Sequence, residues 1–433
     1  MKLRIGRRTG AAVAALSVAA VLAACGGGNQ PGQTAGGGAS AWALTGGSED
    51  MFRAQFDSWN QDNPDDEVAV EWFANDAYKE KIRTAVGAGN APTLIYSWAG
   101  GTLSDYVANG DVVDLGDSTA ELTDKLIPSV AANGQVDGTT YAVPNTQSQP
   151  IVLYYNQELL DAAGVEVPAT YDELLDAVGT LQDNDVIPIA LAGQSVWPEL
   201  MWIQYLTDRI GGPEVFQAVL DGEEGAWSNP AIIEATTKIQ ELVDAGAFGD
   251  SFGSVNADQN ADTALVQTGK AAFVLQGSWV YPSFLESAPD LVASGGLGYT
   301  TFPAIDGGAG DPANIVGNPS NFWSVSADAS PQAQETAKKF ISTEVLNDEA
   351  VEELLAIGTV PPITGLEDKI EQQDNADYLS FVYGMVRDAP HFQLSWDQAL
   401  PAAQSQALLD NLSQLFLGQI DPQQFSEAMD ATL

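Results

Sequence analysis

Four tryptophans in this 433-residue chain stand beside residues that interrupt helices and strands. They are Trp98 before Ala99-Gly100-Gly101, Trp197 before Pro198, Trp279 after Gln276-Gly277-Ser278, and Trp396 between Ser395 and Asp397. An indole offers a wide apolar face at a small entropic cost, so the C–H face of a pyranose ring can stack on it. Amides and carboxylates nearby can bind the ring hydroxyls. The four residues predict one carbohydrate-binding cleft, with core burial as the competing interpretation for each.

Catalytic chemistry has few candidate residues. The chain contains one histidine, His391, and one cysteine, Cys25, so neither a four-ligand zinc site of Cys and His nor an internal disulfide can form. A serine or cysteine nucleophile would have to use His391, which we interpret as a structural residue. The sequence contains neither a P-loop nor a dinucleotide-binding glycine motif. We therefore expect a protein that is not an enzyme and uses no cofactor or metal.

Acidic residues leave two alternatives open. In the run 256–262, Asn and Asp alternate with other residues as in a calcium-binding loop. Its sixth position is Ala261 instead of glycine and its twelfth is Gln267 instead of glutamate, so we favour a cluster that caps a helix. With 59 Asp and Glu in the chain, a carboxylate pair suited to glycoside hydrolysis stays open as well, although no motif marks one.

The chain is strongly acidic, with 16 basic residues against 59 acidic ones and a formal net charge of -43. Such a surface repels phosphate backbones, which excludes nucleic acid as a partner. Because 45% of the residues are apolar and only 17% are charged, the chain can bury a core and is not a disordered acidic segment. Its length predicts two lobes of about 150–200 residues each.

Residues 1–24 are typical of an export signal. Basic residues precede the apolar stretch 11–24, which is shorter than the ~20 residues that span a bilayer. The stretch ends in Leu22-Ala23-Ala24-Cys25, which resembles the lipobox of bacterial lipoproteins; an ordinary secretion signal before an unrelated cysteine is the alternative. Residues 25–40 are rich in glycine and predict a flexible tether. We expect a protein on the outer face of the cell membrane, held there by lipidated Cys25 alone.

The segment after the tether alternates strands and helices. Apolar patterns predict strands at 41–45, 67–73 and 94–98, with helices at 51–60 and 78–88 between them. This order favours a parallel sheet covered by helices, which binds ligands beyond the carboxyl ends of its strands. Helix starts are also predicted at Thr170, Ser330 and Asp421, where a capping residue or a following proline is present.

Four stretches resemble segments of a known family in order and spacing. They are 91–98, the pair 141–144 and 153–160, the stretch 269–279 with its Gly-Lys-Ala-Ala-Phe run, and 330–340. On these stretches the chain resembles the extracellular solute-binding proteins of carbohydrate ABC importers, the family that includes maltose-binding protein. The resemblance covers residues 41–433. It implies an α/β fold of two lobes, each a mostly parallel sheet flanked by helices, with a ligand cleft at the hinge.

The resemblance also implies how the chain is divided. Residues 41–150 and 326–375 are expected to form the first lobe, and residues 151–325 and 376–433 the second. Short β-type runs near 149–153 and 319–325 are suited to cross between the lobes. The lobes would then close over the ligand by a hinge motion.

Matched position by position, the resemblance implies ten ligand-binding residues. Trp98, Trp279 and Trp396 correspond to stacking aromatics of the family, and Trp197 falls where the second lobe contributes another. The other expected contacts are Ser48, Glu49, Gly100, Asn145, Gln147 and Asp397. Where relatives place charged sugar contacts after the first stacking tryptophan, this chain has Ala99-Gly100-Gly101, which implies a differently shaped subsite.

The implied function is that of a lipid-anchored monomer that binds a sugar, by preference an oligosaccharide, and delivers it to the permease subunits of an ABC transporter. Ligand would bind the closed state better than the open one and so shift the hinge equilibrium. The alternative is a lipid-anchored glycoside hydrolase, which needs two carboxylates about 5–9 Å apart across a sugar. A third interpretation keeps the binding fold with a polyol, a peptide or another solute as its ligand.

Overall fold

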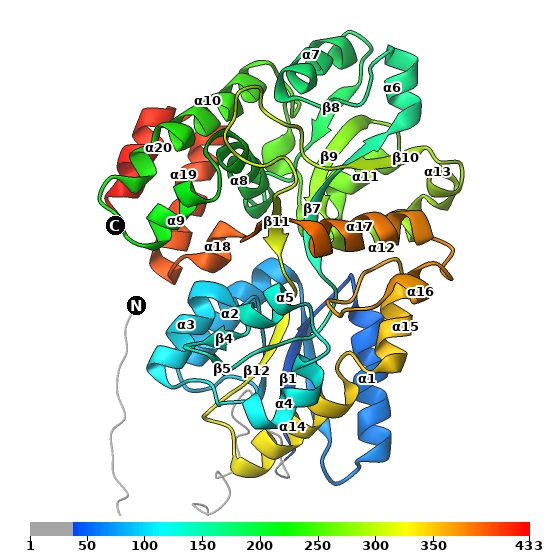
Figure 1. Ribbon diagram of the computed structural model, residues 1–433, viewed down its shortest axis with the longest axis vertical. Coiled ribbons are helices and arrows are strands. Elements are labelled where there is room, and N and C mark those ends of the chain that lie inside the picture. The colour runs from blue at the N-terminus through cyan, green and yellow to red at the C-terminus, as the bar shows by residue number, and fades with distance from the viewer. Residues whose placement is uncertain (1–37) are drawn as a thin grey trace, which may run out of the picture.

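The computed structural model describes residues 38–433 and shows two lobes, each with helices packed around a mixed β-sheet (Figure 1). The predicted signal 1–24, Cys25 and most of the predicted tether lie outside the described residues. Within the described part, no helix combines the length and the apolar character that a membrane crossing requires.

The first lobe contains a sheet with the strand order β2-β1-β3-β12-β6. Its strands are β1 (Ala39–Leu44), β2 (Val68–Phe73), β3 (Leu94–Ser97), β6 (Val143–Pro144) and β12 (Phe322–Val325), and a hairpin of β4 (Gln135–Val136) and β5 (Thr139–Thr140) lies apart from them. Its helices are α1 (Glu49–Asp62), α2 (Asn75–Gly87), α3 (Gly100–Asn109), α4 (Gly116–Thr123), α5 (Pro128–Asn133), α14 (Pro331–Glu344), α15 (Asp348–Ala356) and α16 (Glu367–Ile370).

The second lobe contains a sheet with the order β13-β11-β7-β9-β8, and β10 also pairs with β7. Its strands are β7 (Gln149–Asn156), β8 (Ile187–Ala190), β9 (Ala271–Gly277), β10 (Leu297–Thr300), β11 (Ile315–Asn318) and β13 (Phe392–Leu394). Its helices are α6 (Gln157–Ala163), α7 (Tyr171–Gln182), α8 (Trp197–Gly211), α9 (Glu214–Leu220), α10 (Pro230–Asp244), α11 (Ala261–Gln267), α12 (Tyr281–Ser287), α13 (Pro289–Ala293), α17 (Ala376–Asp388), α18 (Trp396–Ala399), α19 (Ala402–Phe416) and α20 (Pro422–Asp430).

The predicted strands and helices of the N-terminal segment are confirmed, with small shifts at their ends. The predicted helix starts are confirmed too. Thr170 and Asp421 each form a full capping box, and the Ser330 side chain accepts a hydrogen bond from the backbone nitrogen of Ala333. Local side-chain chemistry therefore fixes these helix starts in the way the sequence indicates.

The prediction of mostly parallel sheets is correct for only part of each sheet. β1 is parallel to β2 and β3, but β12 is antiparallel to β3 and β6. In the second sheet, β8 is parallel to β9 and β11 to β13, whereas β7 is antiparallel to β9, β10 and β11. β7 and β12 each follow a crossing between the lobes, so they enter their sheets from the opposite end.

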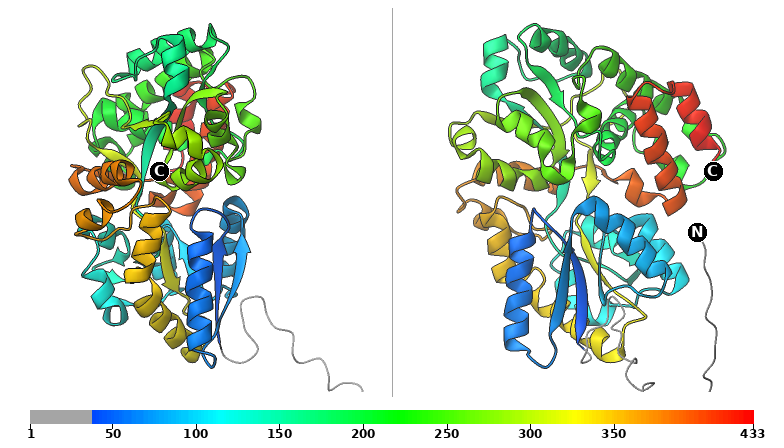
Figure 2. Two further views of the ribbon diagram at one scale, coloured as in Figure 1. Left: turned by 90° about the vertical axis from the view of Figure 1, so that its right-hand side faces the viewer. Right: turned by 180° about the vertical axis from the view of Figure 1, so that it is seen from behind.

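The chain passes between the lobes in residues 145–148, 319–321 and 371–375 (Figures 1 and 2). The first two crossings adjoin or fall within the segments predicted for them. The boundary predicted between residues 325 and 326 is wrong, because β12 belongs to the first sheet. The ring of its Trp323 lies 5.3 Å from that of Tyr96 and 5.8 Å from that of Phe52, centroid to centroid, so β12 completes the core of the first lobe.

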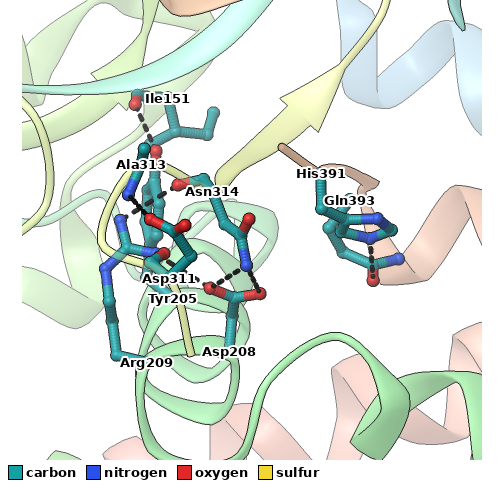
Figure 3. Close-up of polar contacts among 9 residues, drawn as sticks. All are labelled: Ile151, Tyr205, Asp208, Arg209, Asp311, Ala313, Asn314, His391 and Gln393. Carbon is teal, nitrogen blue, oxygen red and sulfur yellow. Dashed lines mark hydrogen bonds and ion pairs between the residues drawn. The ribbon is translucent and has the colours of Figure 1, made fainter. Parts of the chain in front are cut away.

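A buried ion pair fixes the loop that leads into β11 (Figure 3). Arg209 donates from Nη1 to Asp208 Oδ1 at 2.8 Å and from Nη2 to the Asn314 carbonyl oxygen at 3.0 Å. Asp208 Oδ2 accepts from Asn314 Nδ2 at 3.1 Å. Buried charges are tolerated when they are paired and hydrogen-bonded in this way. Because β11 carries Gly317 and Asn318 to the hinge, the ion pair helps to position one wall of the space between the lobes.

His391, the single histidine, lies in the same region (Figure 3). Its Nε2 is 3.2 Å from Gln393 Oε1, and its carbonyl oxygen accepts from the Ile315 backbone nitrogen at 3.0 Å. The backbone bond to Ile315 helps to join β13 to β11.

Candidate functional site

A cavity of about 310 Å³ lies between the two lobes. The chain reaches it just after β1, β3 and β9 end, which is the edge where α/β sheets bind ligands. Amide side chains from the crossing segments and their flanks form part of its wall, namely Gln147, Gln149, Asn318 and Asn321. We refer to this cavity as the inner cleft.

Three partly exposed tryptophans line the inner cleft from both lobes. Trp98 comes from the first lobe, where the edges of Tyr78 and Tyr96 hold its ring at centroid distances of 5.9 and 5.7 Å. Trp197 and Trp279 come from the second lobe, with their rings 5.9 Å apart and tilted by 52°. Apolar faces on both walls can each take one face of a flat ligand ring.

Gly277 is required beneath Trp279. A Cβ atom at this glycine would lie 1.8 Å from the Trp279 ring, so any larger residue would displace the indole. The Gly277-Ser278 pair in the sequence therefore brings the ring down onto the end of β9.

Polar side chains around the tryptophans form hydrogen bonds with each other. Ser48 Oγ donates to Gln147 Oε1 at 3.0 Å, which ties the start of α1 to the first crossing segment. Gln276 Nε2 donates to Asp262 Oδ2 at 2.8 Å. Preorganised amides and hydroxyls of this kind suit a ligand rich in hydroxyl groups.

Charged residues at the cleft join the two lobes. Lys79 Nζ of α2 lies 3.4 Å from Asp397 Oδ2 of α18 and 5.2 Å from the centroid of the Trp98 ring. Asp258 Oδ2 accepts from the Asp76 backbone nitrogen at 3.2 Å, also across the lobes. Burial and the nearby Asp76 raise the pKa of Asp258. Because Lys79 is already paired with Asp397, the charges at the cleft favour a ligand without negative charge.

Six of the ten predicted ligand-binding residues line the inner cleft: Ser48, Trp98, Gln147, Trp197, Trp279 and Asp397. The other four, Glu49, Gly100, Asn145 and Trp396, do not line it.

Trp396 is buried in the core of the second lobe. Its side chain is 1% exposed and stacks on Phe216 at a centroid distance of 4.3 Å, with Trp227 against its edge. Its neighbours Ser395 and Asp397 face the cleft instead. Trp396 is therefore a packing residue beside the cleft wall.

The remaining three residues serve contacts within the protein. Glu49 accepts from the Gly46 backbone nitrogen at 2.8 Å and pairs with Arg53. Gly100 lies against α18, because a Cβ atom there would be 2.3 Å from the carbonyl oxygen of Gln398. Asn145 is fully buried, and its backbone nitrogen donates to the Asn321 carbonyl oxygen at 2.8 Å, which joins two crossing segments.

Sequence reasoning missed several lining residues: Lys79, Gln149, Gln204, Gln276, Asn318 and Asn321. Part of the signal was available, because four of these amides lie in or beside the predicted crossing segments or before the Trp279 turn. Gln204 and Lys79 lie inside helices, where nothing in the sequence indicates which face meets the other lobe.

The run 256–262 leads into the first turn of α11, where Asp262 Oδ1 accepts from the Thr263 backbone nitrogen at 2.9 Å, but the N-cap residue itself does not cap the helix through its side chain. Asn260 adopts a left-handed conformation with φ 51° before α11 and makes no capping hydrogen bond. Asp258 accepts from the Asp76 backbone nitrogen, and the second oxygen of Asp262 accepts from Gln276. Among residues 38–433 no group of three or more His, Cys, Asp or Glu is arranged to hold a metal ion.

Glu199 lies two residues after Trp197 and is buried in the first turn of α8. Burial raises its pKa from 4.5 to about 9. The folded protein keeps this proton between the two values while the unfolded chain releases it, so stability falls as pH rises through this window. We expect Glu199→Gln to make the fall shallower and to raise the melting temperature at neutral and alkaline pH, measured as melting curves across the pH range.

The exposed Glu214 provides the matched control, because Glu214→Gln should leave the pH profile unchanged. At pH values below 4.5 the melting temperatures of the wild type and Glu199→Gln should converge. Glu199 of the wild type is then protonated in the folded and in the unfolded state. Parallel profiles for wild type and Glu199→Gln would show that Glu199 is ionised in the folded protein.

Comparison with known proteins identifies relatives over most of the chain. The model of the bacterial extracellular solute-binding protein family matches residues 34–350. A probable sugar-binding periplasmic protein of Rhizobium meliloti is 28% identical over 211 residues, which are 48% of this chain and 49% of that protein. The chain therefore spans about half the length of the first of its curated relatives. The diacetylchitobiose binding protein of Streptomyces coelicolor is 24% identical over 341 residues, which are 76% of each chain.

Solved structures extend the match to nearly the whole fold. A structure from work on xylan utilization by the thermophilic bacterium Caldanaerobius polysaccharolyticus is 30% identical, with a TM-score of 0.82. It covers 91% of this chain and 99% of its own. Because the family model spans well over half of the sequence and the fold matches throughout, the chain belongs to the bacterial extracellular solute-binding protein family.

Proposed function

We propose that this protein binds a neutral oligosaccharide between its lobes and delivers it to the permease subunits of an ABC importer, without altering it chemically. The observation that carries the proposal is the set of three partly exposed tryptophans, which face the inner cleft from both lobes among amides and hydroxyls. Amino acids and inorganic ions are bound through fixed charges, whereas stacking surfaces suit sugar rings.

Closure of the lobes provides the signal to the transporter. A sugar between Trp98 and the pair Trp197–Trp279 contacts both lobes, so it binds the closed arrangement better and shifts the population toward it. The contacts Lys79–Asp397 and Asp76–Asp258 already join the lobes at the cleft rim. Because three segments connect the lobes, closure takes the form of a hinge motion.

The names of the relatives supply the first ligands to test. One relative is a diacetylchitobiose binding protein, and one solved structure comes from work on xylan utilization. Chitin-derived and xylan-derived oligosaccharides are therefore the first candidates for this chain. Charged monosaccharides and free amino acids serve as comparison ligands.

The test is a thermal-shift screen followed by calorimetric titration on the purified protein. A ligand at 100 times its dissociation constant stabilises the folded state by ~2.7 kcal/mol. We expect a clear rise in melting temperature with at least one neutral oligosaccharide and none with amino acids. Incubation with the same sugars should release no reducing ends, and steady release would favour the glycoside hydrolase alternative. A rise with amino acids alone would contradict the proposal.

We further propose that the protein acts as a monomer anchored to the outer face of the cell membrane through lipidated Cys25. The lipobox-like Leu22-Ala23-Ala24-Cys25 supports this anchor. Replacing Cys25 by serine should release the protein from the membrane fraction into the soluble extracytoplasmic fraction, because the lipid is the expected attachment. Ser17→Ala, inside the signal, is the matched control and should leave the protein on the membrane. Retention of Cys25→Ser in the membrane fraction would contradict the anchor.

A further inference from the structure

A second cavity of about 750 Å³ adjoins the inner cleft. It lies between α2 and α3 of the first lobe and α19 of the second, which face each other on one side of the molecule in Figures 1 and 2. Six residues line both cavities: Lys79, Tyr96, Trp98, Trp197, Asp397 and Gln398. The two cavities therefore share a wall of two tryptophans and one ion pair. We refer to the second cavity as the outer chamber.

One face of α19 forms the far side of the outer chamber. Ala402, Ser405, Leu409 and Ser413 line it at spacings of three or four residues, which places them on one side of the helix. The side chains of Ser405 and Ser413 are partly exposed. The face thus offers hydroxyls beside a short apolar surface, the same mixture that lines the inner cleft.

The charges of the outer chamber select against anions. Its lining contains Asp76, Glu80, Asp105, Asp397 and Asp410 against two cations, Lys79 and Arg83. Both cations are already paired, Lys79 with Asp397 at 3.4 Å and Arg83 with Glu80 at 2.7 Å. Carboxylates accept hydrogen bonds from hydroxyl groups, whereas a carboxylate on the ligand would meet repulsion.

From these features we infer that the outer chamber holds the continuation of the same neutral oligosaccharide whose first units stack in the inner cleft. The sugar chain passes beside Trp98 and Trp197, which line both cavities, and its later units lie against α19. The chamber therefore sets the preferred chain length. This inference rests on the proposed function and adds to it a selectivity for longer, uncharged chains.

The experiment measures affinity against chain length. The probes are xylo-oligosaccharides and N-acetylated chito-oligosaccharides from the disaccharide to the hexasaccharide, titrated by calorimetry. For the series that binds, we expect the wild-type affinity to rise by about tenfold or more between the shortest and longest members, equivalent to ~1.4 kcal/mol. A hexasaccharide of the same backbone carrying uronic acid groups should bind more weakly than the neutral one.

Two substitutions fill the outer chamber without touching the inner cleft. Ser405→Trp and Ser413→Trp, at partly exposed positions on the α19 face, should abolish the gain with length and leave disaccharide affinity within about twofold of wild type. Ala403→Trp is the matched control, because Ala403 is exposed on the same helix and lines neither cavity. Ala403→Trp should keep the full rise in affinity with chain length. Melting curves for all three show that each variant is folded.

The possible failures separate cleanly. Sugar binding with equal affinity for short and long chains, or with the same gain in Ser405→Trp, Ser413→Trp and wild type, overturns the inference and leaves the proposed function standing. Binding of none of the oligosaccharides to the wild type overturns the proposed function and the inference with it.

Discussion

Replacing Trp279 by alanine should weaken oligosaccharide binding by roughly thirty-fold, while the protein stays folded. The ring lies over Gly277 with part of its surface exposed to the inner cleft, and it contacts Trp197 at a centroid distance of 5.9 Å. Loss of a central aromatic contact of this kind costs ~2 kcal/mol or more, and each 1.4 kcal/mol corresponds to a tenfold change in affinity. Calorimetric titration with the best-binding oligosaccharide measures the loss.

The matched control is Trp72→Ala. Trp72 is also partly exposed, but it lies on β2 under the Arg53 guanidinium, 4.1 Å from its ring centroid, and lines neither cavity. Its removal should leave sugar affinity within about twofold of wild type. If Trp279→Ala retained wild-type affinity and instead lost most of its thermal stability, Trp279 would be a packing residue and the inner cleft would need another stacking surface.

The fold could be predicted from the sequence wherever the signal is local. Thr170 and Asp421 start helices because their side chains and the residue three positions later satisfy free backbone groups. The lobe to which β12 belongs could not be predicted in this way. Its buried run Phe322–Val325 suits a strand in either lobe, and its pairing with β3 and β6 and the contacts of Trp323 with Phe52 and Tyr96 place it in the first.

The candidate site could likewise be predicted only where the signal is local in the sequence. Trp98 directly follows β3 and Trp279 is the second residue after β9, so chain order alone brings them to the edge where cleft residues lie. Asn318 and Lys79 depend on how the lobes meet, which no periodicity in one chain segment reports. Trp396 has the same kind of sequence neighbours as Trp98, but its side chain points into the core of the second lobe and not into the cleft. Successive residues of a short helix such as α18 point in different directions, so Asp397 lines the cleft while Trp396 does not.

Because Trp396 is buried in the core, replacing it by alanine should lower the free energy of unfolding by about 3–5 kcal/mol. Its side chain is 1% exposed and fills the space between Phe216 and Trp227 in the core of the second lobe. The surrounding helices cannot close fully over the void, so both burial and ring contacts are lost. Denaturant unfolding, with the midpoint and slope fitted separately, measures the change.

Trp396→Phe separates packing from sugar contact, because a phenyl ring keeps the stacked contact with Phe216 and leaves a smaller void. Its stability should therefore fall between those of the wild type and Trp396→Ala. Titrated well below their melting temperatures, both variants should bind oligosaccharide within about threefold of wild type, since the cleft-facing neighbour Asp397 keeps its bond to Lys79. If either variant lost most of its oligosaccharide affinity while its stability stayed unchanged, Trp396 would be a ligand contact. That result would contradict the placement of α18.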